Sequence, residues 1–340
     1  MHIKNMTIDQ IEDWFRNRGE PAFRCTQLLE WLYRKWAVSF DEMTNLPKDL
    51  RQQLADTFVP FSLQEAGVSR ADDGTEKYVL QLRDGETVEC VLIPSARRRT
   101  VCISSQVGCP VRCAFCASGR HGLVRDLEPA EIVDQVLFAC RRFGERVTNV
   151  VVMGIGEPLL NLQHVTAACE NLCDPRLLDL GARRITISTS GIPAGIRKLA
   201  QAEPQWNLAL SLQATTDRDR DRLIPAAYRF PLADICKACS LYRHKTGRQL
   251  TIEFALIAGQ NDSSRDADRL ADMAAELAAK VNLIPYNETG TAFQAPSRDD
   301  VHAFRDRLEQ KNVRTTIRQR RGDTIAAACG QLRHRRSEGS

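Results

Sequence analysis

The sequence contains no run of about 18 apolar residues, which is the shortest stretch expected of a membrane-spanning helix. Its first residues, MHIKNMTIDQIEDWF, lack the basic-then-apolar order of a signal peptide. We also find no tandem repeat and no low-complexity linker. These absences favour a folded protein of the cytoplasm without membrane contact, and 340 residues suit one barrel-sized domain plus a smaller one.

The chain also lacks a large excess of either sign of charge, because its net charge is only +4. Such a balance does not by itself indicate a nucleic-acid partner. Basic residues nevertheless cluster within residues 97–99, 314–321 and 333–336. Clusters of this kind are usually solvated surface, and contact with phosphate is the alternative interpretation.

Cysteine, in contrast, is plentiful, with 12 residues. In the reducing cytoplasm these thiols should not form a disulfide scaffold, so the better question is metal binding or catalysis. Cysteines within helical patterns are usually small buried hydrophobes. Cys236 and Cys239 have the CxxC spacing of a metal site, but they lie mid-helix without a second pair, and we expect no metal there.

Four segments differ in their hydrophobic pattern. Residues 1–75 show helical periodicity, as in FRCTQLLEWLYRK (23–35), and predict a small helical domain. Residues 76–98 alternate around an Asp84-Gly85 turn and predict a hairpin. Residues 99–290 alternate short apolar strands with helices, and residues 291–340 form a C-terminal extension. The strands are expected at residues 100–106, 149–155, 184–190, 207–213, 250–257 and 281–287.

Strands and helices that alternate in this way predict an α/β fold with a parallel sheet. The sheet is either open and doubly wound or curved into a partial barrel. In both arrangements ligands bind at the carboxyl ends of the strands.

The densest chemical motif is Cys109-Pro-Val-Arg-Cys113-Ala-Phe-Cys116, in the loop after the first of these strands. Three thiolates from one loop can bind three irons of a [4Fe-4S] cubane and leave the fourth iron open to a ligand. Zinc is the competing interpretation, but a structural zinc site normally needs four ligands, and no second cysteine pair follows at a suitable distance. The spacing therefore favours an iron–sulfur cluster.

Polar residues follow several strands at the edge where ligands are expected. Gly156 ends the second strand, where a glycine lets the backbone approach a ligand, and the Glu157 carboxylate can accept hydrogen bonds from an ammonium group. Any one such residue is more often an ordinary strand end, but their joint placement favours a binding site. The other residues at these ends are Ser188, Ser211, Leu212, Gln213 and Asn287.

Taken together, these motifs resemble the RlmN/Cfr family of radical S-adenosylmethionine (SAM) RNA methyltransferases, over nearly the whole chain. The resemblance implies a partial (β/α)6 barrel with a small N-terminal helical domain, a [4Fe-4S] cluster on the three loop cysteines, and SAM at the strand ends. The chain departs at Gln213, where the family usually has histidine, and glutamine also donates and accepts hydrogen bonds. The matching motifs are SSQVGCPVRCAFCASG (104–119), MGIGEPLLN (153–161), ITISTSG (185–191), LALSLQA (208–214), VNLIPYN (281–287) and RGDTIAAACGQL (321–332).

The resemblance also implies a radical reaction. C2 and C8 of adenine are poor nucleophiles, so the cofactors must supply a radical instead of a polar methyl transfer. Cys329 would receive a methyl group from one SAM, and a radical from a second SAM would take a hydrogen from it before the carbon adds to the base. Cys102 would release the product by forming a disulfide with Cys329. Glu89 aligns with the family's proton acceptor, although on sequence alone it reads as an exposed strand carboxylate, and Cys329 as a small core residue.

We therefore expect methylation of adenine C2 in 23S rRNA at the peptidyl transferase centre, and in tRNA next to the anticodon. Gly156-Glu157-Pro158, in place of the GEA of Cfr, favours this over a Cfr-like C8 enzyme that confers antibiotic resistance. A non-catalytic RNA-binding metal protein is the alternative of another class. The expected partners are RNA, bound by residues 1–75 and the arginine clusters, and an external electron donor such as flavodoxin. The expected state is a monomer.

Overall fold

The computed structural model describes residues 1–225, 228–319, 321–322 and 325–332. Arg320 and the basic cluster at residues 333–336 lie outside the described residues. Within the described part, no helix has both the length and the apolar character needed to cross a membrane.

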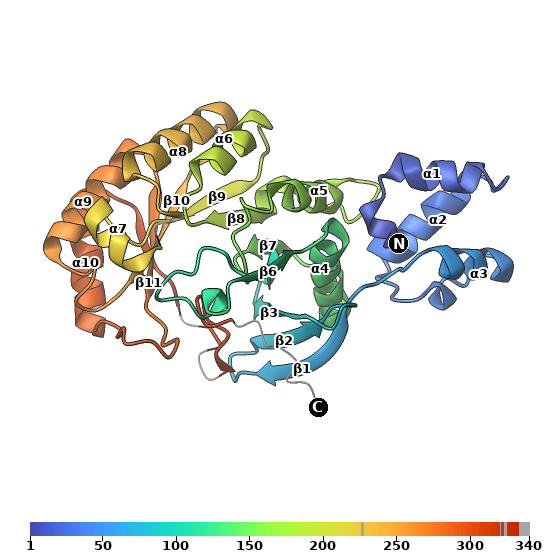
Figure 1. Cartoon of the computed structure of the whole chain (residues 1–340), viewed down its shortest axis with the longest axis horizontal. Helices are drawn as coiled ribbons and strands as arrows, with labels where there is room; N and C mark the ends of the chain where they lie inside the picture. Colours follow the sequence, from blue (N-terminus) through green and yellow to red (C-terminus); the bar gives the residue numbers. More distant parts are fainter. Residues whose placement is uncertain (226–227, 320, 323–324, 333–340) are drawn as a thin grey trace.

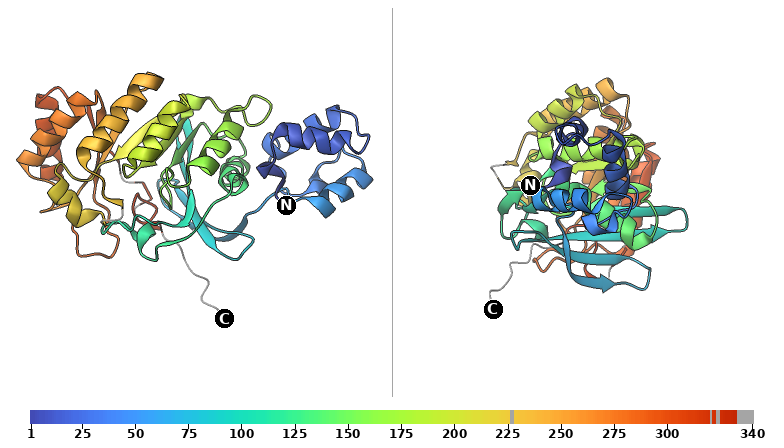
Figure 2. Two further views of the ribbon diagram at one scale, coloured as in Figure 1. Left: turned by 45° about the horizontal axis from the view of Figure 1, so that its top comes forward. Right: turned by 90° about the vertical axis from the view of Figure 1, so that its right-hand side faces the viewer.

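A small helical module stands to one side of the molecule, next to α4 and α5 (Figure 1, Figure 2). Thr7 begins its first helix in a capping box with Gln10, and Ile8, Ile11 and Phe15 lie on the buried face of that helix. The module consists of η1 (Ile3–Asn5), α1 (Ile8–Arg16), α2 (Phe23–Tyr33), η2 (Phe40–Glu42) and α3 (Lys48–Thr57).

One buried carboxylate ties this module to α4 (Pro129–Phe143). Asp134 accepts a hydrogen bond from Lys4 Nζ at 2.7 Å and lies 3.0 Å from His2 Nε2. The backbone N–H and the hydroxyl of Ser62 also donate to it, both at 2.8 Å. Burial opposes ionisation of Asp134, but Lys4 and His2 outweigh it and lower the pKa of Asp134 from 3.8 to about 2. This buried ion pair fixes the position of the module on the main domain.

The main domain is built on a ten-stranded sheet with the order β1-β2-β3-β4-β7-β8-β9-β10-β11-β12. From β4 to β12 neighbouring strands are parallel. The sheet curves strongly, and α6, α8, α9 and α10 cover its outer side (Figure 1). This curvature confirms the partial barrel over a flat doubly wound sheet. The strands are β4 (Arg98–Ile103), β7 (Asn149–Val152), β8 (Ile185–Thr189), β9 (Asn207–Ser211), β10 (Thr251–Leu256), β11 (Lys280–Pro285) and β12 (Thr315–Ile317).

Helices follow most of the parallel strands and bury their apolar faces against the sheet. On α4, for example, Ile132, Val133 and Val136 are fully buried, and on β8 and β9 so are Ile187 and Leu208. The remaining helices are α5 (Leu162–Cys173), α6 (Pro193–Gln201), α7 (Asp217–Leu223), α8 (Leu232–Thr246), α9 (Ser264–Glu276) and α10 (Arg298–Gln310).

Three antiparallel strands extend the sheet at one edge: β1 (Gln64–Arg70), β2 (Glu76–Gln81) and β3 (Thr87–Ser95). The β2–β3 hairpin confirms the turn predicted at residues 84–85. The expectation that helical structure continues to residue 75 is wrong, because helix α3 ends at Thr57 and residues 64–70 form a strand. β1 is a mostly exposed edge strand held by backbone pairing to β2, so its local sequence carries no buried apolar alternation.

Candidate active site

The carboxyl ends of the parallel strands surround one cavity, here called the strand-end cavity. The cysteine loop, residues 109–122, and the C-terminal loop, residues 325–332, complete its wall. Such placement follows from the parallel sheet, whose strands all end at the same edge. Lining residues include Cys109, Cys113, Cys116, Gly154, Gly156, Glu157, Ser188, Ser211, Gln213, Glu253, Asn287 and Cys329.

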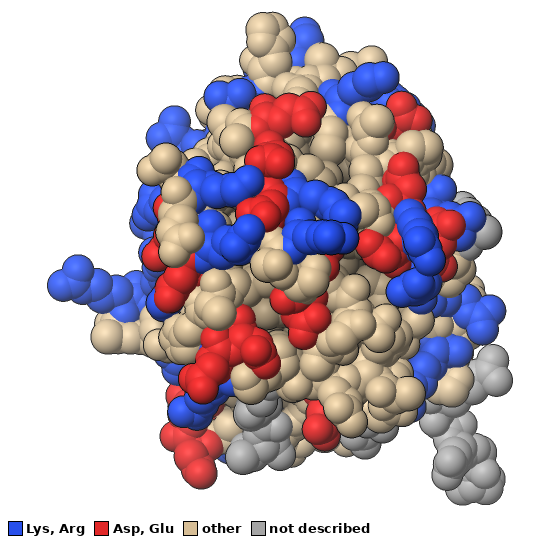
Figure 3. Space-filling model, turned by 90° about the vertical axis from the view of Figure 1, so that its left-hand side faces the viewer, with Lys and Arg blue, Asp and Glu red and all other residues tan. Residues whose placement is uncertain are grey.

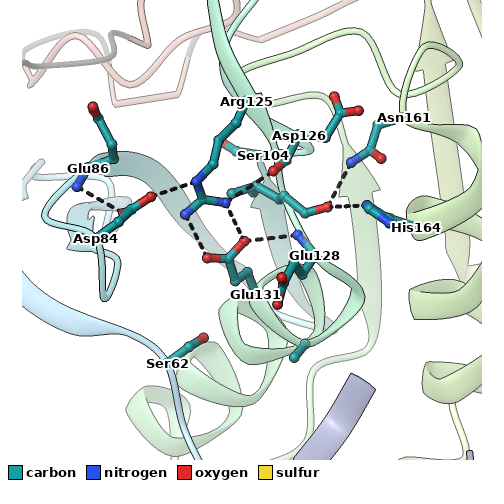
Figure 4. A network of polar contacts seen from close by, with 12 residues as sticks. Ser62, Asp84, Glu86, Ser104, Arg125, Asp126, Glu128, Glu131, Asn161 and His164 are labelled. Atoms are coloured by element: carbon teal, nitrogen blue, oxygen red, sulfur yellow. Dashed lines mark hydrogen bonds and ion pairs between the residues drawn. The ribbon is translucent and has the colours of Figure 1, made fainter. Parts of the chain in front are cut away.

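The cysteine loop is anchored at both ends. It runs between β5 (Gln106–Gly108) and β6 (Leu123–Asp126), which pair antiparallel and were not predicted from the sequence. Arg125 on β6 donates to Asp84 at 2.6 Å and to both carboxylate oxygens of Glu131 at 2.8 Å (Figure 4). Within the loop, the Ala114 N–H donates to the carbonyl of Leu223 on α7 at 2.9 Å. The loop therefore has a fixed position over the cavity.

The three cysteines of this loop all line the strand-end cavity. Burial raises the pKa of Cys109 to about 12, and burial followed by the neighbouring thiolate charges raises the pKa of Cys113. Among the described residues, no three His, Cys, Asp or Glu side chains converge as they would on a single metal ion. A cubane distributes its thiolates over different irons, so this finding is compatible with a cluster. Three crowded thiols on one cavity wall are a suitable donor set for it.

Glu157 is buried in the loop that follows β7 and keeps its carboxylate at the cavity wall. Its Oε2 accepts from the Ser190 N–H at 2.7 Å and its Oε1 from the Leu159 N–H at 3.1 Å. Burial raises the pKa of Glu157, so a cationic ligand would stabilise its ionised form. Gly156 has φ of 112°, and a Cβ there would lie 2.6 Å from Ser105 Oγ, so this glycine permits a close approach between two strand ends.

Hydroxyl and amide groups from the next strands complete the polar wall. Ser188 Oγ donates to Glu253 Oε2 at 3.3 Å. Gln213 Nε2 donates to Ser211 Oγ at 2.5 Å, and this hydroxyl keeps its own proton for another acceptor. Leu212, which the sequence placed among the binding residues, does not line the cavity and is fully buried in the hydrophobic core.

Asn287, at the end of the sixth predicted strand, has one satisfied and one unsatisfied side-chain atom. Its Nδ2 donates to the carbonyl of Cys329 at 3.2 Å. Its Oδ1 is buried and has no hydrogen-bond partner among the described residues. A buried acceptor without a donor is rare in folded proteins, so the atom fits a ligand that brings an N–H or O–H group, as SAM does.

A second cavity, here called the side cavity, adjoins the first. Cys102 on β4 lines it together with Arg318, and Cys329 and Asn287 line both cavities. Cys329 therefore stands in the wall between the three-cysteine loop and Cys102. Burial, and next the charge of Cys329, raise the pKa of Cys102 to about 12. Both are free thiols, so the disulfide expected during turnover is not present in this structure.

Hydrogen bonds join the C-terminal loop directly to the cysteine loop. The Ala117 N–H donates to the Gly330 carbonyl at 2.8 Å, and Ser118 Oγ donates to the Leu332 carbonyl at 2.8 Å. Gln331 Nε2 donates to the carbonyl of Glu288 at 2.9 Å. The segment that carries Cys329 is thus held against the loop that carries the three cysteines.

Glu89 is not the exposed carboxylate that its sequence setting indicated. It is 1% exposed on β3 and lies 3.5 Å from Lys77 Nζ. Lys77 Nζ also donates to the carbonyl of Ala326 in the C-terminal loop at 3.0 Å. The sheet turns this face of β3 inward under the C-terminal loop, which local alternation could not indicate. Glu89 lines neither of the two cavities.

Two further charged residues at the site were missed by sequence reasoning. Glu253 is a buried carboxylate on β10, and Arg318 lies 3.3 Å from it while lining the side cavity. The sequence attributed Arg318 to a basic surface cluster, whereas the fold turns it inward to this partner. A carboxylate inside the apolar strand LTIEFALI was the signal that could have found Glu253.

Comparison with known proteins decides the family. The family model of the ribosomal RNA large subunit methyltransferase N-terminal domain matches residues 1–59, and that of the radical SAM superfamily matches residues 103–271. A dual-specificity RNA methyltransferase RlmN of Geotalea uraniireducens is 45% identical, and the alignment covers 98% of this chain and 96% of the relative. The chain belongs to the RlmN family of RNA methyltransferases.

A further sequence relative and a solved structure also match over nearly the whole chain. A probable dual-specificity RNA methyltransferase RlmN of Rhodopirellula baltica is 43% identical, with 99% of this chain and 92% of the relative covered. The crystal structure of a radical SAM methyltransferase from Sphaerobacter thermophilus superposes with a TM-score of 0.94 at 41% identity, covering 98% of this chain and 99% of that one. Membership in the radical SAM superfamily implies SAM and a [4Fe-4S] cluster as cofactors.

Proposed function

We propose that this RlmN family member methylates C2 of an adenine in 23S rRNA at the peptidyl transferase centre and of an adenine next to the anticodon in tRNA. The main support for this proposal is the position of Cys329, which lines both the strand-end cavity and the side cavity. A methyl carrier must meet the methyl donor on one side and the base on the other, and this position allows both. The dual specificity in the relatives' names supports two RNA substrates.

The cofactors are assigned to the strand-end cavity. Cys109, Cys113 and Cys116 hold the cluster, and Glu157 accepts hydrogen bonds from the amino group of SAM. When bound, the cluster and SAM supply the radical chemistry. Asn287 Oδ1 would accept a hydrogen bond from bound SAM while its Nδ2 keeps the carbonyl of Cys329 in place. Ser188, Ser211 and Gln213 would complete the polar surface that SAM contacts.

Cys329 and Cys102 act in separate steps of the methyl transfer. Cys329 Sγ would lose its proton and take a methyl group from one SAM, and that methyl group would give up a hydrogen atom when a second SAM is used. The carbon left on the sulfur would join C2 of the base and so link base and protein, one electron would return from this adduct to the oxidised cluster, and the proton on C2 would leave. The Cys102 thiol would then lose its proton and bond to the Cys329 sulfur while the bond from that sulfur to the carbon breaks; the electron pair of the broken bond stays with the product, which takes up a proton, and a disulfide is left for later reduction. The shared wall of the side cavity supports this pairing.

Glu89 is assigned as the acceptor of the proton that leaves the base. Its burial beside Lys77 means that its charge is stabilised in a dry setting, where proton transfer is not lost to bulk water. Glu89 lines neither cavity in this structure and lies under the C-terminal loop, which carries Cys329. The hydrogen bond from Lys77 to the Ala326 carbonyl connects Glu89, through Lys77, with that loop.

RNA binding is assigned to residues 1–75 together with the arginine clusters. On the face over α9 and α10, basic and acidic side chains intermingle (Figure 3). Pairs between these helices include Arg307 with Asp268 and Lys311 with Asp272. The match of residues 1–59 to an rRNA methyltransferase domain supports the helical module, and not the face over α9 and α10, as the RNA-binding part. An external electron carrier such as flavodoxin reduces the cluster, and the reaction takes place in the cytoplasm.

Nucleoside mass spectrometry tests the proposal. A bacterial strain without its own RlmN gene is complemented with this chain or with its Cys329→Ala variant, and rRNA and tRNA are digested separately. We expect 2-methyladenosine in both RNA classes only with the unaltered chain. 8-Methyladenosine in rRNA would instead establish the Cfr-like reaction, and the absence of both 2-methyladenosine and 8-methyladenosine would contradict catalysis.

A further inference from the structure

Arg220, on α7 behind the cavity wall, is fully buried. Its Nη1 donates to the carbonyl of Leu212 at 2.8 Å, and its Nη2 donates to the carbonyl of Ser190 at 2.5 Å. Its Nε has no hydrogen-bond partner among the described residues. Both of these partners are neutral carbonyls, so within the described part of the chain no anion contacts the positive charge.

A guanidinium buried without a counter-charge is unfavourable, because desolvation is not repaid by ion pairing. Burial lowers the pKa of Arg220, while the charges of Cys113, Asp217 and Glu157 raise it, in that order. The two carboxylates are engaged elsewhere. Asp217 is exposed and accepts from the Leu232 N–H at 2.9 Å, and Glu157 accepts from two other backbone N–H groups. This leaves Cys113, which would carry negative charge once it holds the cluster, as the group that Arg220 can offset.

The local packing brings α7 against the cysteine loop. Leu223, one helical turn after Arg220, accepts through its carbonyl from the Ala114 N–H between Cys113 and Cys116. Leu223 and Val111 lie in one hydrophobic cluster, with Cys113 packed against it. Ser190, whose carbonyl Arg220 holds, also lines the strand-end cavity. Arg220 thus lies directly behind the wall that carries the cysteines.

We propose that Arg220 is the built-in counter-charge of the iron–sulfur cluster, a positioning residue that stabilises its anionic thiolate-ligated form and favours its one-electron reduction. This inference rests on the proposed assignment of the cluster to Cys109, Cys113 and Cys116. A cubane on three thiolates is anionic, and the electron delivered by the external carrier makes it more so, with no covalent bond formed or broken. A fixed cation nearby favours the more negative state and raises the reduction potential.

Variants of Arg220 separate charge from hydrogen bonding. Arg220→Lys keeps the charge, Arg220→Gln keeps donors without charge, and Arg220→Met keeps neither. Arg218→Gln is the matched control, because it removes a positive charge that faces solvent on the same helix. The chains are reconstituted anaerobically with iron and sulfide, and the midpoint potential is measured by redox titration, followed by visible absorption and electron paramagnetic resonance. Iron content is measured in parallel.

We expect Arg220→Gln and Arg220→Met to shift the midpoint potential to more negative values, while Arg220→Lys and Arg218→Gln stay near the unaltered protein. Arg220→Gln with full iron and an unchanged potential would overturn the proposal. Should the neutral variants fold but lose iron, retention of iron by Arg220→Lys supports the counter-charge, and loss of iron there too contradicts it. A failure of the unaltered chain to hold any cluster would instead refute the cluster assignment under the proposed function.

For variants with little cluster, the gain in thermal stability on cluster loading gives a second measurement. The gain is the difference in Tm between loaded and cluster-free forms of the same variant, so losses common to both forms cancel. We expect a smaller gain for Arg220→Gln than for the unaltered protein and Arg220→Lys. Equal gains in all variants would show that Arg220 only braces the Leu212 and Ser190 carbonyls.

Discussion

Asn287 donates from Nδ2 to the backbone carbonyl of Cys329 across 3.2 Å, and its Oδ1 on the other side is left for a ligand. The residue assigned to SAM thus also holds the segment that carries the assigned methyl acceptor. One amide side chain connects cofactor occupancy with the position of Cys329.

Asn287→Asp should separate these two tasks. An ionised aspartate has the same shape but no N–H, so the hydrogen bond to Cys329 is lost at a cost of about 1 kcal/mol. We expect methylation of Cys329 to slow several-fold, measured by peptide mass spectrometry over time after SAM is added at saturation. Asn282→Asp, on β11 just before Asn287 but outside both cavities, is the control and should methylate normally. Normal methylation in Asn287→Asp would refute the connection.

Cys113→Ala should lose the cluster. Three thiolates from the cysteine loop leave no substitute ligand within it, so iron content should fall to near zero while the fold is retained. Iron and sulfide assays with absorption near 400 nm are the measurement, and circular dichroism monitors the fold. Cys236→Ala, at a buried cysteine on α8 that lines neither cavity, is the matched control and should load fully. Full iron in Cys113→Ala would remove the cluster assignment.

Cys329 and Cys102 should fail at different stages. Protein treated with SAM should contain methylated Cys329, and Cys329→Ala should lose RNA methylation while it keeps its cluster. Cys102→Ala should accumulate RNA attached covalently through Cys329, visible as a shifted band on a denaturing gel that nuclease removes. If both were merely small core residues, each alanine would cost about 1 kcal/mol of stability and leave activity intact. A fully active Cys329→Ala enzyme contradicts the carrier mechanism.

The ion pair of Lys4 with Asp134 should control stability in acid. Because the pKa of Asp134 is lowered from 3.8 to about 2, its ionised form contributes stability above about pH 4 that is lost as the pH falls through 2. Lys4→Met removes one partner of a buried pair and should cost about 3 kcal/mol, with acid unfolding starting at a higher pH. Lys35→Met breaks an exposed pair with Glu30 and should cost about 1 kcal/mol or less. Urea unfolding across this pH range is the measurement.

RNA binding by residues 1–75 should be strongly dependent on salt. Phosphate contacts release counterions, so affinity for an rRNA fragment should fall steeply between about 50 and 200 mM salt. Arg16, Arg18 and Lys35 are exposed basic residues of the module. Replacing all three by glutamine should weaken binding and flatten the salt dependence, measured by filter binding. Replacing Arg305, Arg307 and Lys311 on the α10 side is the control, and equal losses in both triple variants would argue against a special role of the module.

The sequence determined most of the elements and half of the site. Short apolar strands that alternate with helices required a parallel sheet, and the carboxyl-end rule then placed Gly156, Glu157, Ser188 and Asn287 at one edge. Three cysteines within eight residues were sure to meet at one wall, because the chain between them is too short to separate them. These results depend only on local spacing and on strand direction.

Only the tertiary structure determined which side chains from distant segments contact one another. Leu212 was placed among the binding residues by its position after a strand, yet its apolar side chain is buried in the core. Nothing in the sequence around Glu89 indicates its burial beside Lys77. Arg220 and Arg318 each lie in a charge-rich stretch typical of solvated surface, yet one is fully buried and the other pairs with Glu253. Hydrophobic spacing reports which face of an element is apolar, but the partner of a single charged side chain depends on which remote segment packs against it. That pairing exists only once the sheet has closed around the cavity.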